Sequence, residues 1–373
     1  MAANRIAAII AMLALWSPPA RAHEAGLGHQ DVKSGPDAVY RVAQHGKWGF
    51  INVKGEFVIQ PSFEAADDFN EGLARVMIGG KWGYIDAKGQ TAIEPKYSDA
   101  GDFAEGLAPV ELDGKWGYID PKGEFAIKPQ FFLKGSKEAA GEFTEGLALV
   151  ATGSRWGFID KTGGLVIPAQ FSEATPFSEG LAAVVMGNPT LRRWGYIDVA
   201  GKPVIQPGYE EACPFSQGLA CVKKDGKWGY LDKRGKWALD AEYDFAHFFR
   251  EGLAAVERSG KWGFIDPSGA AVIEPQFKMG FSFSEGLALV QIGENYGFID
   301  KTGKVVIDPQ PDFVAGFSGE LAPTTRVAGC EEDGVIKLEV KTAYVNKTGK
   351  RVWQSEGYDL DVQEAKSDVP PAR

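Results

Sequence analysis

The sequence is poor in the residues that most often carry chemistry. Its 373 residues include only 3 Cys and 4 His, with no Cys-x-x-Cys pair, phosphate-binding glycine loop or nucleophile-base arrangement. A free N-terminal amine at His23, with His29 as a third ligand, would have the chemistry of a copper site. A polar linker explains these histidines better, because nothing fixes the segment. We therefore expect no metal and no cofactor.

Basic stripes and long apolar runs are also lacking. The formal net charge is −10, and an acidic surface repels phosphate backbones, so nucleic-acid binding is disfavoured. After the first residues no segment is apolar enough to cross a bilayer, so we expect no transmembrane segment in the mature chain.

The N-terminus has the layout of a secretory signal peptide. Arg5 precedes an apolar stretch over residues 6–16, and Ala20-Arg21-Ala22 provides small residues for cleavage. The alternative, a buried apolar helix, fits poorly because the following chain is polar. We predict a signal peptide over residues 1–22, a flexible linker over 23–38, and a periplasmic or secreted protein. Cleavage would remove Arg5 and Arg21, changing the net charge from −10 to −12.

The three cysteines are Cys213, Cys221 and Cys330. Export would permit a disulfide between Cys213 and Cys221, which flank one inter-unit segment, with Cys330 unpaired. The other interpretation treats Cys213 and Cys221 as small buried apolar residues. Neither interpretation implies catalysis.

Glycine is abundant, with 47 residues, and many glycines belong to an internal repeat. A Trp-Gly pair recurs most often at a spacing of 34 residues, and tandem repetition overrides the usual estimate of domain number from length. A Glu-Gly-Leu-Ala landmark follows the aromatic residue by 23 residues in most copies. The aromatic residues of this register, which we predict to form the repeat core, are Trp48, Trp82, Trp116, Trp156, Trp194, Trp228, Trp262 and Tyr296.

The repeated unit is predicted to be a three-stranded antiparallel meander. Asp113-Gly114 has the sequence of a type I′ turn and joins the Leu-Ala strand to the Trp-Gly strand. Asp86 to Gly89 has the pattern of a second turn, into a third strand that ends at Pro95. Both faces of the Trp-Gly strand are apolar, which indicates burial between stacked neighbours.

About nine units are expected over residues 39–353, with residues 354–373 as a disordered C-terminal tail. The ninth unit has an enlarged first hairpin and a degenerate middle strand at Tyr344-Val345-Asn346, as terminal repeats often do. We expect an all-β open superhelical stack of meanders. The alternative is a closed β-propeller, although nine units exceed the usual four to eight blades and no strand is evidently shared across a closure.

These motifs resemble those of the bacterial WG (tryptophan-glycine) repeat proteins. Residues 80–86 and 114–120 match the family pattern Gly-Lys-Trp-Gly-aromatic-Ile-Asp residue for residue, and the resemblance covers roughly residues 39–353. It implies a β-rich repeat array and supplies no catalytic residues. Tyr296 and Asn52 depart from the pattern.

The recurring carboxylates invite comparison with glycoside hydrolases, which need two carboxylates at a defined separation. A residue repeated at a turn in many units is better explained by turn chemistry. The repeated aromatics could likewise form a sugar-stacking ladder, but a central strand between two hairpins is better placed for a core. We expect no enzymatic activity.

The remaining hypothesis is a non-catalytic protein-protein interaction scaffold in the cell envelope, with an envelope or extracellular protein as partner. A carbohydrate- or peptidoglycan-binding module, with a polysaccharide ligand, is the alternative, and a hydrolase comes third. Repeat stacks expose long surfaces, so contact residues are sought where the repeat is broken. The candidates are Lys134, Lys137, Glu138, Arg192, Arg193, Glu331, Glu332 and Asp333.

Overall fold

The computed structural model describes residues 38–136, 138–186, 191–311, 313–332 and 335–362. Every element in these ranges is a strand, so they contain no helix able to span a membrane. The predicted signal peptide and all but the last residue of the predicted linker lie outside them. The all-β class and the tandem array of antiparallel meanders are confirmed.

The middle strand of each unit carries the Trp-Gly pair. It lies between two antiparallel neighbours, as in the second unit, where Trp82 is opposite both Met77 and Tyr97. We number the units 1 to 9 by their middle strands: β2 (Lys47–Asn52), β6 (Lys81–Asp86), β10 (Lys115–Ile119), β14 (Arg155–Asp160), β17 (Arg193–Asp198), β21 (Lys227–Asp232), β25 (Lys261–Ile265), β29 (Asn295–Ile299) and β33 (Val335–Asn346).

The Leu-Ala strand, here called the second strand, pairs with the middle strand through the predicted tight turn. Asp113 and Gly114 both have positive φ, 53° and 76°, as a type I′ turn requires. The second strands are β1 (Val39–Gln44), β5 (Leu73–Ile78), β9 (Ala108–Leu112), β13 (Leu147–Gly153), β16 (Leu181–Met186), β20 (Leu219–Lys224), β24 (Ala254–Arg258), β28 (Ala288–Ile292) and β32 (Leu321–Glu332).

The outer strands do not end at proline, which corrects the sequence analysis. In unit 2 the strand continues through Pro95 to Tyr97, and the ladder shifts register between Trp82 and Tyr84. Proline is tolerated because the irregular ladder needs no N–H there. The outer strands are β3 (Phe57–Phe63), β7 (Thr91–Tyr97), β11 (Phe125–Leu133), β15 (Leu165–Phe171), β18 (Pro203–Tyr209), β22 (Trp237–Tyr243), β26 (Ala271–Phe277), β30 (Val305–Gln310) and β34 (Arg351–Gln354).

Most units contain a fourth, inner strand that the three-stranded prediction missed. Because it is mostly two residues long, it leaves no periodicity in the sequence. The inner strands are β4 (Ala65–Ala66), β8 (Asp99–Ala100), β12 (Ala140–Thr144), β19 (Glu211–Ala212), β23 (Phe245–Ala246), β27 (Met279–Gly280) and β31 (Phe313–Val314). In unit 5 a single bridge between Ala174 and Val184 takes its place.

Glycine follows the tryptophan because the outer strand crosses directly over it. A Cβ built on Gly83 would lie 2.6 Å from the carbonyl oxygen of Ile93 and 2.7 Å from the nitrogen of Pro95. Both are backbone atoms, which cannot rotate away. The same contact recurs at Gly49, Gly117, Gly157, Gly195, Gly229, Gly263 and Gly297.

The hydrophobic core lies between units. One cluster joins Tyr84, Ile93 and Tyr97 of unit 2 to Phe103 and Val110 of unit 3. Since most of the buried surface is shared, a single unit has little core of its own, as the sequence predicted.

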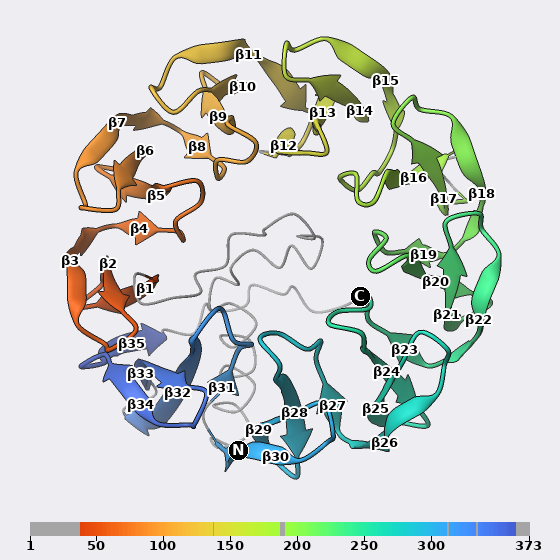
Figure 1. Cartoon of the computed structure of the whole chain (residues 1–373). Coiled ribbons are helices and arrows are strands. Elements are labelled where there is room, and N and C mark those ends of the chain that lie inside the picture. Colours follow the sequence, from red (N-terminus) through yellow and green to blue (C-terminus); the bar gives the residue numbers. More distant parts are fainter. Residues whose placement is uncertain (1–37, 137, 187–190, 312, 333–334, 363–373) are drawn as a thin grey trace, which may run out of the picture.

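The array closes into a ring, as Figure 1 shows. Buried Tyr40 and Ile51 of unit 1 cluster with Leu321 and Trp353 of unit 9, and the hydroxyl of Tyr344 donates to the carbonyl of Arg41 at 2.8 Å. These contacts therefore fit the closed arrangement that the sequence analysis gave as the alternative, and they do not fit an open stack. Among the described residues no strand is shared across the seam between units 9 and 1, and the contacts there join side chains to side chains or to backbone groups.

Unit 9 is larger than predicted. β32 and β33 each have 12 residues, and β35 (Tyr358–Val362) pairs with β33. This strand lies within the range assigned to a disordered tail, so the array extends beyond residue 353. Asn346 acts as the repeated Asp does, because its Oδ1 accepts the N–H groups of Thr348 and Lys350.

Candidate functional site

The repeated aspartates at the ends of the middle strands serve as turn residues. Asp86 Oδ1 accepts the N–H groups of Lys88 and Gln90, both at 2.9 Å. In unit 4 the hydroxyl of Thr162 and the backbone N–H groups of Gly164 and Thr162 hold the pKa of Asp160 below its usual value. These carboxylates therefore bond within their own turns, as turn chemistry predicts.

The repeated glutamates join consecutive units. Glu71 Oε2 accepts the N–H of Gly106 in the next unit at 2.9 Å, and Gln217 Oε1 accepts that of Gly252 at 2.9 Å. An amide serves as well as a carboxylate because only an acceptor oxygen is needed. The same bond is made by Glu105, Glu145, Glu179 and Glu251.

This role predicts a difference between two substitutions at Glu145, whose Oε2 accepts the N–H of Gly180 at 2.8 Å. Glu145→Gln should leave the free energy of unfolding nearly unchanged, whereas Glu145→Ala should lower it by about 1 kcal/mol through loss of the hydrogen bond. Chemical denaturation measures both. An equal loss in the two variants would contradict the role of the acceptor oxygen.

The tryptophans of the register are core residues to different extents. Trp116, Trp194, Trp228 and Trp262 are buried, and Trp48, Trp82, Trp156 and Tyr296 are partly exposed. A guanidinium covers two of the partly exposed rings, Arg41 over Trp48 at 5.5 Å and Arg75 over Trp82 at 5.3 Å. These rings therefore offer no continuous stacking surface.

Residues that vary from unit to unit form a cross-strand pair at the inner edge of most units, here called the inner pair. In unit 2 the Asp67 N–H donates to the carbonyl of Arg75 at 3.1 Å. The same backbone bond joins Gly101 to Pro109, Thr175 to Ala183, Cys213 to Cys221, His247 to Ala255, Phe281 to Leu289 and Ala315 to Pro323. The sequence analysis missed these pairs because the inner strands were not predicted.

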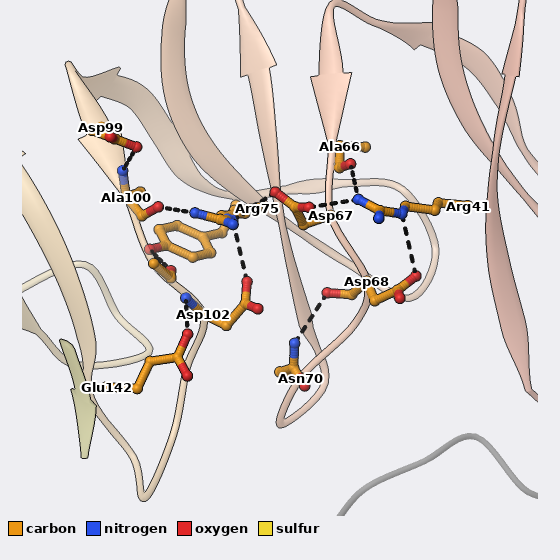
Figure 2. Close-up of polar contacts among 12 residues, drawn as sticks. Arg41, Ala66, Asp67, Asp68, Asn70, Arg75, Asp99, Ala100, Asp102 and Glu142 are labelled. Carbon is orange, nitrogen blue, oxygen red and sulfur yellow. Dashed lines mark hydrogen bonds and ion pairs between the residues drawn. The ribbon is translucent and has the colours of Figure 1, made fainter. Parts of the chain in front are cut away.

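Charged residues of units 1 to 4 gather around the inner pair of unit 2, Asp67 and Arg75 (Figure 2). Arg41 donates to Asp67 Oδ1 at 2.5 Å and to the carbonyl of Ala66 at 3.2 Å. Arg75 Nε lies 2.8 Å from Asp67 Oδ2 and 3.2 Å from Asp102 Oδ1. We call Arg41, Asp67, Asp68, Arg75, Asp99, Asp102 and Glu142 the charged cluster.

Arg75 is largely buried, its side chain being 10% exposed. Burial works to lower the pKa of its guanidinium, but Asp102 and Asp67 outweigh burial and raise that pKa above its ordinary value. The guanidinium also donates to the carbonyl of Ala100 in unit 3. Arg75 is thus a charged link between two units, where most other units have an apolar residue.

Removing this guanidinium should be costly. We expect Arg75→Leu to lower the free energy of unfolding by about 2 kcal/mol, because Asp102 and Asp67 would both lose this buried guanidinium, although Asp67 keeps Arg41. Lys96→Leu, which changes an exposed cation of the same unit, is the matched control and should change stability by less than about 0.5 kcal/mol. Thermal unfolding at neutral pH compares the two, and similar losses would contradict the assigned role.

Cys213 and Cys221 form a disulfide with Cα atoms 5.4 Å apart. They occupy the inner pair of unit 6, the place that Asp67 and Arg75 have in unit 2. Cys330 lies in β32, in a stretch whose side chains are not described.

Aromatic and apolar residues gather at the inner edge of units 7 and 8, across the ring from the charged cluster (Figure 1). The ring of Phe245 is 38% exposed and lies 5.3 Å from Trp228 and 5.6 Å from Trp262. His247 packs on Trp262 at 5.2 Å. Met279 of unit 8 is 40% exposed.

The predicted contact residues do not come together with the charged cluster. Lys134 and Glu138 are exposed at the insertion after β11. Arg192, just before β17, pairs with Glu173, and Arg193, the first residue of β17, pairs with Glu210. Lys137 and Asp333 lie outside the described residues, as do His23 and His29, and the side chains of Glu331 and Glu332 are not described.

Within the described ranges no group of three His, Cys, Asp or Glu side chains is arranged to hold a metal ion. His45 contacts Glu356 at 2.7 Å on the exposed side of the seam.

One of two solved structures similar to this chain agrees with this architecture. The crystal structure of a eukaryotic initiation factor superposes with a TM-score of 0.59 and 14% identity, covering 87% of this chain and 96% of that one. The extracellular domain of the hybrid two component system BT4673 from B. thetaiotaomicron gives a TM-score of 0.32 and 10% identity, covering 87% and 60%. The first of these likenesses shows the fold alone. No curated protein matches the sequence significantly.

The model of the WG containing repeat matches eight consecutive segments: 48–82, 82–116, 116–155, 156–188, 194–228, 228–262, 262–296 and 296–324. The chain belongs to the WG repeat family.

Proposed function

We propose that this protein is a non-catalytic protein-protein interaction scaffold, exported to the cell envelope, that binds its partner at the inner edge of the ring. One observation carries this proposal. The repeated Asp and Glu side chains bond within or between units, whereas the inner pairs hold residues that vary from unit to unit.

Charge indicates what kind of partner would fit. The five carboxylates and two guanidinium groups of the charged cluster give a net charge of −3, and Asp68 is 43% exposed. A partner segment containing lysine or arginine would complement this surface and be steered toward it. We therefore favour a basic segment of an envelope or extracellular protein.

Export is supported by the disulfide between Cys213 and Cys221, because disulfides persist mainly in oxidising compartments. We expect that replacing Leu13 and Leu15 by Arg, within the apolar stretch of the predicted signal peptide, retains an uncleaved precursor with reduced Cys213 and Cys221. Cell fractionation with thiol labelling measures this. Normal export of that variant would exclude the proposed leader.

The binding site can be tested with a photo-crosslinking amino acid in intact cells. Placed at position 68 it should capture a discrete protein partner, and the capture should weaken as salt is raised. Placed at Glu94, an exposed position on the outer strand of the same unit, it should capture little. Equal capture at both positions would contradict the proposed surface.

A carbohydrate- or peptidoglycan-binding module is the second candidate, and exposed Phe245 favours it. Aromatic rings held by neighbouring rings can stack on sugar faces. This alternative predicts retention on polysaccharide that soluble sugars displace and that Phe245→Ala abolishes. A hydrolase would instead show turnover that one carboxylate substitution in a single unit eliminates.

A further inference from the structure

Unit 8 departs from the repeat at two positions. In its middle strand Tyr296 takes the place of the tryptophan that units 1 to 7 have. Its inner strand begins with Met279, and no other described inner strand begins with methionine. The first residues of four other inner strands are Ala65, Asp99, Glu211 and Phe245. The two departures occur together in one unit, which raises the question of whether their side chains meet.

Met279 and Tyr296 lie in one cross-strand row. Met279 is opposite Gln291 of β28, and Gln291 is opposite Tyr296 of β29. Side chains at opposite positions of paired strands point to the same face of a sheet. The hydroxyl of Tyr296 donates to Sγ of Met279, with 4.0 Å between oxygen and sulfur. A tryptophan at this position would have no hydroxyl to place there, so the two departures from the repeat form a single contact.

Met279 is also accessible from solution. It is 40% exposed, whereas the other two methionines of the described ranges, Met77 and Met186, are partly buried. Met186 packs against a core cluster shared by units 4 and 5. An oxidant dissolved in water reaches an exposed thioether before a covered one. Among these three methionines, Met279 is therefore the expected place of reaction.

Peroxide is the class of oxidant that fits this thioether. The sulfur lone pair attacks one peroxide oxygen, the O–O bond breaks, and a proton moves to the departing oxygen, so methionine and hydrogen peroxide give methionine sulfoxide and water. Sulfur loses two electrons, and peroxide gains them. A thioether sulfur is only a weak hydrogen-bond acceptor, and the new sulfoxide oxygen is a stronger one. The hydroxyl of Tyr296, which already points at the sulfur, is placed to donate to that oxygen.

We propose that Met279 is a site of reversible oxidation by peroxide, at which the hydroxyl of Tyr296 binds the sulfoxide oxygen and thereby selects one of the two sulfoxide epimers. Methionine sulfoxide reductases, one type for each epimer, restore the thioether. Met279 and exposed Phe245 begin neighbouring inner strands, so the modification replaces an apolar side chain by a polar one at this part of the inner edge. This inference does not depend on the identity of the partner.

The rate of oxidation tests the site itself. The full-length protein is treated with dilute hydrogen peroxide, and peptide mass spectrometry follows sulfoxide formation at Met77, Met186 and Met279 in the same sample. We expect Met279 to react at least about tenfold faster than the other two, because its side chain is the exposed one. Equal rates at the three methionines would overturn the proposal.

The ratio of epimers tests the role of Tyr296. After oxidation and digestion, reductases of the two types are applied separately to the Met279 peptide, and each reduces one epimer. We expect about a fivefold excess of one epimer in the natural protein, the ratio that one ordinary hydrogen bond gives, and near-equal amounts in Tyr296→Phe, which removes only the hydroxyl. Tyr209→Phe, which removes a hydroxyl from unit 5, is the matched control and should keep the excess. Equal epimers in the natural protein, or an undiminished excess in Tyr296→Phe, would reject the proposed site.

Discussion

Replacing Gly83 by alanine should lower the free energy of unfolding by about 3 kcal/mol. The new methyl group would lie 2.6 Å from the oxygen of Ile93, so either the middle or the outer strand must move. Movement of the outer strand would in turn displace Ile93 and Tyr97 from the core shared with unit 3. Urea denaturation followed by tryptophan fluorescence measures the loss.

Gly141→Ala is the matched control for this prediction. Gly141 lies in β12, its φ is not positive, and the nearest atom to a Cβ there is the Leu149 oxygen at 3.6 Å, an ordinary contact. This variant should differ from the natural protein by less than about 0.5 kcal/mol. If both alanines cost the same, the close crossing of the outer strand is not what requires glycine after tryptophan.

Removing the side chain of Tyr40 should open the ring. Tyr40 is 3% exposed, packs on Tyr344, and its oxygen accepts the N–H of Glu320 at 2.9 Å. Tyr40→Ala should cost about 3 to 5 kcal/mol, as for other large-to-small core substitutions. Because no strand crosses the seam in the part of the chain that the structure describes, the loss would fall on the contact that joins unit 9 to unit 1. Small-angle scattering should show a larger radius of gyration with the strand content of the other units retained.

Tyr40→Phe separates packing from hydrogen bonding. It keeps the ring of the side chain and removes the hydroxyl that accepts the Glu320 N–H, so we expect a loss of about 1 kcal/mol and an unchanged radius of gyration. A Tyr40→Ala protein that stays as compact as the natural one would show that the remaining seam contacts, such as Phe57 with Trp353, suffice for closure.

Much of the unit was predictable because its determinants are local. Asp113-Gly114 defines the tight turn, and Asp86 to Gly89 defines the second turn. Apolar residues on both faces of the middle strand indicate that both faces are buried. Pro95 misled the prediction of the outer strand, since its effect depends on a bulge that only the partner strand reveals.

The inner strands and the ring closure could not be predicted by the same means. The inner strand Ala65–Ala66 is too short for a periodic pattern to identify. Closure of the ring depends on the sum of the small rotations between consecutive units over nine junctions. Tyr40 is a sign of the ring closure in the sequence, because its counterpart in the other eight units is alanine. The candidate site was missed for a related reason: Asp67 and Arg75 become partners only once the inner strand is in place.

The seam also bears on where the chain has to begin. Gly55 lies against the backbone of Val352 and the Cβ of Trp353, in the position at which Gly89 lies against the side chain of Ile59 of the preceding unit, so the junction between units 9 and 1 places its elements as the other junctions do. A circularly permuted protein, with the ends joined by a short linker and a new start at the exposed turn after β11 near Gly135, should therefore fold to the same ring. The order of units around the ring, rather than the point at which translation begins, would then determine the fold.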